Sequence, residues 1–206
     1  MRPRRRAAAP GGEGLRIFFM RVSRALTEMQ PKLPICAFDA KTGILCGNCE
    51  ARLSKGEITE ADVKASKAIA SLADRFPELG KTTLKRASET RGSYVLEFEQ
   101  SDMGPLRSNP QLHEELEAAL KGKAYLVGAG VSDRQFLEEV FYPARVLTVN
   151  TVWLPDGEKK TKVVVPAKRS ERRLGDFDKL RETVKRARGI DLLVETEREV
   201  AASLHS

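Results

Sequence analysis

The 206-residue sequence predicts an α+β protein with two similar units, each a three-stranded sheet with helices on one face. The first observation behind this prediction is a repeated order of helix, strand, strand, loop, helix and strand, found in residues 55–130 and again in residues 131–197. The second is that all three cysteines lie between Cys36 and Cys49, ahead of the first unit. We therefore expect a small cysteine-bearing segment, residues 31–54, and a helix to precede the first sheet.

The leader, residues 1–30, is rich in arginine and nearly free of acidic residues. Arg16, Arg21 and Arg24 interrupt its apolar residues too often for a signal peptide or a membrane span. A disordered basic leader is favoured, with an organelle transit peptide and a true start at Met20 as the alternatives. Because the cysteines are odd in number and no secretory segment is evident, we expect a cytoplasmic protein without a membrane partner, ending in a short tail at 198–206.

The window from Pro34 to Cys49 spaces its side chains much as a zinc site spaces its ligands. One Cys-x-x-Cys pair is complete, and in the other an aspartate stands in place of the second thiol. Tetrahedral zinc accepts two such pairs, and a carboxylate oxygen can replace one sulfur although it is the harder donor. Gly43 and Gly47 are expected at turns that require a positive φ. We predict one structural Zn²⁺, with free thiols or a redox pair as the alternatives. The predicted zinc ligands are Cys36, Asp39, Cys46 and Cys49.

The first unit opens on a helix whose start is marked by Thr59 as N-cap and by Asp62 as its partner in a capping box. Arg91 and Gly92 are typical of a tight turn between two strands. After a loop, apolar residues recur at helical spacing over 112–120. The expected elements are a helix at 59–75, strands at 82–88 and 93–99, a loop at 101–110, a helix through 112–120 and a strand at 123–127.

In the second unit, Ser132 is the expected N-cap of a helix that stops before Pro143. Residues 154–157 predict a hairpin turn, and Gly189 a helix C-cap. Trp153 directly precedes the hairpin turn, where packing in the hairpin or the core is favoured over stacking on a base. The expected elements are a helix at 132–141, strands at 145–153 and 160–165, a basic loop at 166–176, a helix at 177–188 and a strand at 190–194.

Basic residues outnumber acidic ones by 36 to 29, which gives a formal net charge of +7. The excess concentrates between Lys162 and Arg188, where ten basic side chains stand against four acidic ones. Such an excess favours a polyanion such as nucleic acid as partner, with a solvated helix face as the alternative. His113 and His205 are the two histidines, and His113 is expected on an exposed helix face. With no nucleophile and base set and no complete phosphate loop, we expect neither an enzyme nor a small-molecule substrate.

Several stretches resemble one known family. Residues 141–146, Val149-Asn150 and the hairpin into 163–166 resemble the junction between the two KH domains of archaeal NusA-like transcription factors. Residues 101–104 resemble the end of the second strand in the first of those domains. The cysteine window resembles the zinc-knuckle extension of a cysteine-bearing branch of the same family. The resemblance implies two type II KH units preceded by a zinc knuckle, with RNA as the ligand.

The family's Gly-x-x-Gly loop is degenerate in both units. At this position the first unit has Arg107-Ser-Asn-Pro-Gln111, without glycine, and the second keeps only Gly175. The resemblance therefore implies a non-enzymatic RNA-binding protein of transcription elongation or termination, or one acting on ribosomal RNA, whose contacts are mainly to the RNA backbone. The alternative is a protein–protein adaptor that docks on RNA polymerase or the ribosome through its zinc knuckle. The expected RNA-contacting residues are Lys168, Arg169, Arg172, Arg173, Gly175 and Lys179.

Overall fold

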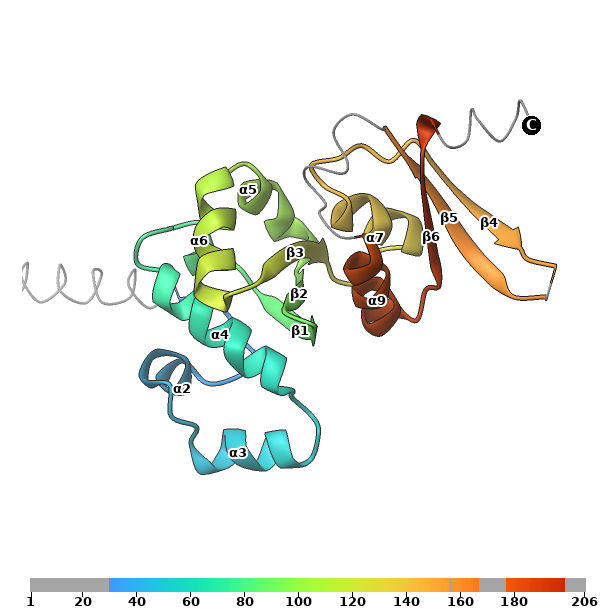
Figure 1. Cartoon of the computed structure of the whole chain (residues 1–206). Helices are drawn as coiled ribbons and strands as arrows, with labels where there is room; N and C mark the ends of the chain where they lie inside the picture. The colour runs from blue at the N-terminus through green and yellow to red at the C-terminus, as the bar shows by residue number, and fades with distance from the viewer. Residues whose placement is uncertain (1–29, 156, 167–176, 199–206) are drawn as a thin grey trace, which may run out of the picture.

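The computed structural model describes residues 30–155, 157–166 and 177–198. Within them, two three-stranded sheets and their helices follow one another along the chain (Figure 1). The predicted α+β class with two three-stranded sheets is confirmed. The predictions of a disordered leader, a basic loop and a tail fall almost entirely outside the described residues.

The first sheet consists of β1 (Leu84–Thr90), β2 (Ser93–Phe98) and β3 (Lys123–Gly128), in the order β1-β2-β3. β1 runs antiparallel to β2, and β3 runs parallel to β2. Arg91 and Gly92 both have positive φ, at 49° and 77°, as a two-residue turn between antiparallel strands requires. The predicted turn is therefore confirmed.

The second sheet repeats this arrangement with β4 (Thr148–Trp153), β5 (Lys159–Val165) and β6 (Leu192–Thr196). β4 and β5 form an antiparallel hairpin, and β6 lies parallel to β5. β4 begins three residues later than expected, because the backbone N–H of Ala144 closes a turn onto the carbonyl of Phe141 before the strand can start.

Two helices, α4 (Glu60–Leu72) and α6 (Pro110–Leu120), cover one face of the first sheet. Thr59 and Asp62 form the predicted capping box at the start of α4. The expected loop at 101–110 instead contains the 3-10 helix η2 (Gln100–Asp102) and the short helix α5 (Met103–Arg107). The core on this face comprises Ala65, Ile69, Leu72, Leu84, Leu96, Phe98, Met103, Leu106, Leu112, Leu116 and Leu126.

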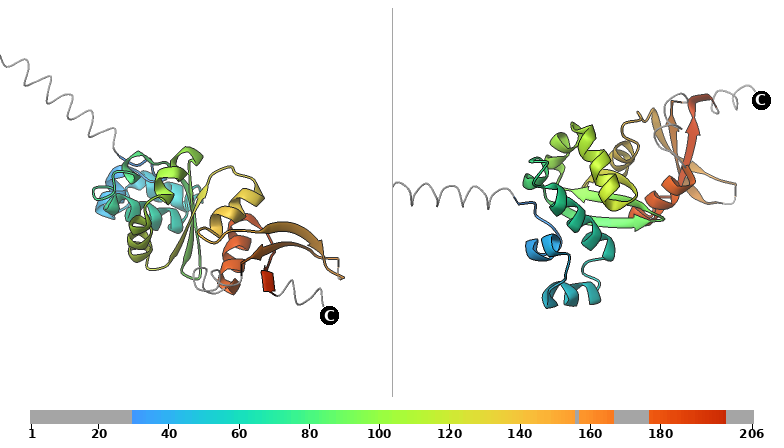
Figure 2. Two further views of the ribbon diagram at one scale, coloured as in Figure 1. Left: turned by 90° about the horizontal axis from the view of Figure 1, so that it is seen from above. Right: turned by 60° about the vertical axis from the view of Figure 1, so that its left-hand side comes forward.

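Two further helices, α7 (Asp133–Val140) and α9 (Phe177–Arg188), lie between the two sheets (Figure 1, Figure 2). The helices of each unit lie on one face of its own sheet, as expected, but α7 and α9 also cover the second face of the first sheet. The reason is that β2 and β3 carry apolar residues at successive positions, which point to opposite faces. This shared core comprises Val95, Tyr125, Val127, Phe136, Leu137, Val140, Val163, Val165, Leu180, Val184 and Val194.

The cysteine-bearing segment forms two short helices, α2 (Ala37–Thr42) and α3 (Gly47–Ser54). It packs on α4 through a small cluster in which Ile35 and Cys49 contact side chains such as Val63. Figure 2 shows α2 and α3 beside α4, while Lys32 at the start of the segment forms a bridge with Thr83, next to β1. Because α4 also packs on the first sheet, it holds the cysteine-bearing segment in a fixed place.

Trp153 lies at the end of β4 with 70% of its side chain exposed, so the expectation of packing in the core or hairpin is wrong. Among the helices that the structure describes, none is long and apolar enough to cross a membrane.

Asp62 joins α4 to β1, and its removal tests the fold. Its carboxylate accepts hydrogen bonds from the backbone and hydroxyl of Thr59 and from the backbone N–H of Ala87, and it is 4% exposed. We expect Asp62→Ala to lower the free energy of unfolding by about 2–4 kcal/mol, because it removes a helix cap and leaves a buried N–H without an acceptor. Urea denaturation measures this. The control is Glu60→Ala in the same turn, where the side chain is exposed; equal losses in the two variants would contradict this role of Asp62.

Candidate functional site

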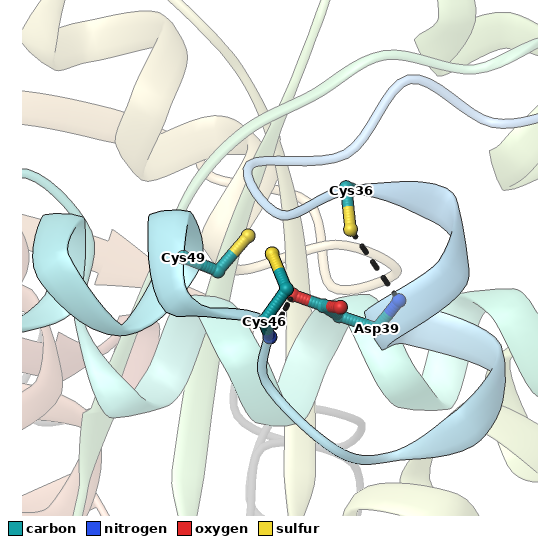
Figure 3. Close-up of side chains that lie close together, drawn as sticks. All are labelled: Cys36, Asp39, Cys46 and Cys49. Carbon is teal, nitrogen blue, oxygen red and sulfur yellow. Dashed lines mark hydrogen bonds between the residues drawn. The ribbon is translucent and has the colours of Figure 1, made fainter.

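The four predicted metal ligands lie at the starts of two helices (Figure 3). Cys36 is the N-cap of α2 and Asp39 is the third residue of that helix; Cys46 and Cys49 hold the same two positions in α3. An N-cap side chain and the third helical side chain lie at the same end of a helix. The Cys-x-x-Asp and Cys-x-x-Cys spacings therefore place each pair of side chains at the start of one helix. The two helix starts face each other (Figure 3).

One ligand atom from each of these four residues lies within 4.8 Å of the other three. Donors around a tetrahedral zinc with Zn–S bonds of about 2.3 Å are about 3.8 Å apart, so small side-chain movements are enough to close the site. Asp39 is fully buried, and its Oδ1 atom makes no hydrogen bond to any described residue. A buried carboxylate oxygen without a partner is costly, and a metal ion would satisfy it. The cluster can hold a metal ion.

Asp39 also organises the cluster electrostatically. Its pKa lies well below the ordinary value, chiefly because of the adjacent Cys49 thiol and then because the backbone N–H of Cys46 donates to Oδ2 at 3.0 Å. In return, the carboxylate raises the pKa of Cys49 to about 12. In the metal-free protein Cys49 therefore stays protonated at neutral pH, and a bound cation would have to displace this proton.

The loop between the two helices is fixed by Gly43 and Lys67. Gly43 ends α2 with a φ of 78°, as predicted, and its carbonyl accepts a hydrogen bond from Lys67 Nζ of α4 at 2.7 Å. Gly47 is the first residue of α3 and is not among the glycines with positive φ, so that prediction is wrong. Phe38 and Ile44, on either side of Gly43, are 70% and 73% exposed. The candidate metal centre thus carries two exposed apolar side chains.

A second candidate site is a cleft of about 470 Å³ between α6, β3 and the segment after α7. Its lining residues are Arg107, Pro110, His113, Glu114, Glu117, Lys123, Ala124, Tyr125, Leu126, Glu139, Tyr142 and Pro143. The cleft brings together residues from both units. The sequence interpretation missed it because its side chains are far apart in the chain and join only when α7 packs on β3.

Arg107 and Tyr142 form one wall of this cleft. The Arg107 guanidinium lies over the Tyr142 ring, 5.6 Å from its centroid, and pairs with Glu139 Oε1 at 3.0 Å. Glu139 is buried and also accepts a hydrogen bond from the backbone N–H of Gly128. Tyr142 is 47% exposed, so one aromatic ring is held by a cation and remains open to a ligand.

His113 and Tyr125 supply neutral polar groups to the cleft. Burial lowers the pKa of His113, and its Nε2 atom is buried without a hydrogen-bond partner among the described residues. Burial also raises the pKa of Tyr125 to about 12, so its hydroxyl stays protonated. The expectation that His113 is a surface residue is wrong, because it is half-buried. Lys123 and Glu117 form an ion pair of 3.0 Å at the edge of the cleft.

Of the predicted RNA-contacting residues, Lys168, Arg169, Arg172, Arg173 and Gly175 lie outside the described residues, while Lys179 is exposed on α9. In the first unit the degenerate loop position is a capped turn. Asn109 accepts a hydrogen bond from the backbone N–H of Leu112, and Pro110 is the first residue of α6. This turn lies directly beside the cleft, since Arg107 and Pro110 line it.

No protein-family model matches this chain, and no curated protein sequence matches it. Among solved structures, one titled "Crystal structure of APE1850" is similar with a TM-score of 0.42 and 14% sequence identity, over 64% of this chain and 96% of that chain.

Differential alkylation tests the arrangement of the cysteines. In metal-free protein we expect iodoacetamide to modify Cys36 first and Cys49 last, because Cys36 is exposed whereas Cys49 is buried and has a pKa near 12. Peptide mass spectrometry gives the order. Since a raised thiol pKa favours the neutral form at every pH well below it, Cys49 should stay slow as the solution is made mildly alkaline. Equal rates for the two cysteines, or no protection of either by added zinc, would contradict the arrangement.

Proposed function

We propose that this chain is a non-enzymatic RNA-binding protein of the NusA-like class, with two degenerate type II KH units, acting in transcription elongation or termination in the cytoplasm. The observation that carries the proposal is the cleft between α6 and β3. The repeated strand order and direction in the two sheets supports it, because a tandem pair of like units is what the sequence resemblance implies.

The chemistry of the cleft suits an unpaired base. The Tyr142 ring offers a stacking surface backed by Arg107, and single-stranded RNA is recognised largely by stacking on aromatic rings and guanidinium planes. His113 Nε2 and the Tyr125 hydroxyl are neutral groups that can hydrogen-bond to a base edge. The volume, about 470 Å³, is in the range of small-ligand pockets. Two carboxylates of the lining, Glu117 and Glu139, are already paired with cations and therefore repel phosphate less.

The strongly basic stretch between Lys162 and Arg188 supplies the backbone contacts in this proposal. The chain has a formal net charge of +7, and the local excess there is ten basic residues against four acidic ones. Contacts of this kind neutralise phosphates without reading bases, which is the behaviour expected where Gly-x-x-Gly loops are degenerate. RNA affinity should therefore depend steeply on salt and weakly on sequence.

The cysteine cluster is a structural zinc site in this proposal, with three sulfur donors and Asp39 as the fourth. The three cysteine thiolates suit zinc better than magnesium or calcium, which prefer oxygen ligands. Four protein donors leave no open position on a tetrahedral ion, which favours a structural role over a catalytic one.

An adaptor that docks on RNA polymerase or the ribosome is the second candidate function. Phe38 and Ile44 favour it, because both are highly exposed on the cysteine-bearing segment. Large apolar side chains that are this exposed gain little from folding and can be buried by a partner.

Metal analysis of purified protein should find about one zinc per chain. Chelator competition should show weaker binding for Cys49→Ser and tighter binding for Asp39→Cys, because thiolate is the softer donor. Glu50→Gln is the matched control, since it changes an exposed carboxylate next to Cys49 and should leave the chelator midpoint unchanged. An unchanged midpoint for Asp39→Cys would place Asp39 outside the metal's ligands.

RNA binding is tested by fluorescence anisotropy of a labelled single-stranded oligonucleotide over a range of salt concentrations. Tyr142→Ala should raise Kd about tenfold, because one stacking contact of about 1–3 kcal/mol is lost, and should leave the salt dependence unchanged. The double variant Arg172→Ala, Arg173→Ala should instead lower the slope of log K against log salt by about 1.4, since each of two phosphate contacts contributes about 0.7.

The matched control for charge is Lys41→Ala with Lys55→Ala, which removes two exposed cations within and directly after the cysteine-bearing segment. An equal change of slope in this control would mean that RNA affinity depends on the total charge of the protein and not on Arg172 and Arg173. Absence of any binding at low salt would reject the RNA-binding function and favour the adaptor.

A further inference from the structure

The β4–β5 hairpin extends beyond the helices that cover the rest of its sheet (Figure 1, Figure 2). Along one face of the hairpin the cross-strand pairs are Val149 with Val163, then Thr151 with Thr161, then Trp153 with Lys159. Val163 is fully buried in the core shared with α7 and α9, whereas Trp153 is 70% exposed. The same face of the hairpin therefore passes from the protein core to an open surface at its tip.

The tip keeps its shape without help from the tryptophan ring. The backbone N–H of Leu154 donates to the carbonyl of Glu158 at 2.9 Å, and the N–H of Gly157 donates to the carbonyl of Leu154 at 2.9 Å. Gly157 has a φ of 84°, which closes the turn at little steric cost. Trp153 is thus a large aromatic side chain that contributes little to folding. The hydrogen-bonded backbone of the β4–β5 hairpin holds it at the surface.

The residue paired with Trp153 across the hairpin is a lysine, Lys159. Lys160 pairs with Glu158 at 3.3 Å and Lys162 with Glu195 at 2.6 Å, so these two ammonium groups are largely compensated. Lys159, which is exposed and lies directly opposite Trp153, makes no ion pair with any residue that the structure describes. Among the residues that the structure describes, the tip therefore combines one open aromatic face with one cation that makes no ion pair.

We propose that the tip of the hairpin is a second contact for single-stranded RNA, in which a base stacks on Trp153 and a neighbouring phosphate pairs with Lys159. An aromatic platform beside a cation is how proteins bind single strands without reading their sequence. An apolar protein partner fits less well, because the neighbours of Trp153 on this face are Thr151, Thr161 and Lys159 and not further apolar side chains. This inference rests on the proposed RNA-binding function and extends it to the opposite end of the molecule from α6.

Trp153 is the one tryptophan of the chain, so its fluorescence reports this contact alone. Titration of the full chain with a short oligoadenylate should quench the tryptophan emission, because stacked bases quench indole. Trp153→Ala should raise Kd about tenfold in an anisotropy assay with the same oligonucleotide, and Trp153→Phe should retain part of the affinity. The matched control is Phe38→Ala, which removes an aromatic side chain that is also 70% exposed, at the distant cysteine-bearing segment; it should leave Kd unchanged.

Inorganic polyphosphate separates stacking from charge, since it offers phosphates without bases and should compete for the protein without quenching Trp153. Equal quenching by polyphosphate would overturn the proposal. So would anisotropy that reports oligoadenylate binding with no quenching and with unchanged affinity for Trp153→Ala; in that case the RNA-binding function stands and only the hairpin contact is rejected. Emission that shifts with protein concentration in the absence of RNA would assign Trp153 to self-association and likewise overturn it. No binding of oligoadenylate by anisotropy rejects the RNA-binding function itself.

Discussion

The arrangement of the whole molecule depends on one constraint, which is that β2 and β3 are apolar on both faces. Side chains at successive positions of a strand point in opposite directions, so Leu96 and Val95 need two separate layers of cover. α4 and α6 supply one layer from the first unit. The other layer is α7 and α9, which also serve as the core of the second sheet. The two units therefore share a hydrophobic core and are not structurally independent.

The cleft is a direct consequence of this shared core. When α7 packs on the first sheet, it brings Glu139 to the backbone N–H of Gly128 at the end of β3 and to Arg107 at the end of α5. A buried carboxylate with these partners is strongly disfavoured if one of them is lost, so the pair fixes the two units against each other. The exposed Tyr142 follows α7 directly and is held in place by the same arginine. The cleft thus lies where the two units meet and exists only when both are folded.

The parts of the structure that the sequence predicted are those set by local chemistry. Thr59 and Asp62 predicted the start of α4, Arg91-Gly92 the first hairpin, and the x-x spacing the cysteine cluster, because each signal lies within a few residues of the element it determines. α5 was missed because five residues are too few for a helical period to show. The roles of His113 and Trp153 were missed for a different reason: burial depends on what packs above a side chain, and that is decided by the distant helices α7 and α9.

The exposed aromatic groups of the candidate sites are placed so that each can be changed without unfolding the protein. The four candidate metal ligands lie in a small cluster beside α4, and Tyr142 is half-exposed at the junction of the two units. Trp153 is at the tip of a hairpin whose turn is closed by backbone hydrogen bonds. None of these side chains except Cys49 and Asp39 is deeply buried. Loss of an exposed ring costs little stability, so a change in affinity measured for Tyr142→Ala or Trp153→Ala reports the contact and not unfolding. At Cys49 and Asp39 the opposite holds: replacing either side chain also disturbs local structure, because the helices α2 and α3 are too short to be stable without the contacts made at their first turns. In the proposed zinc site, metal loss and loss of this local structure would therefore occur together.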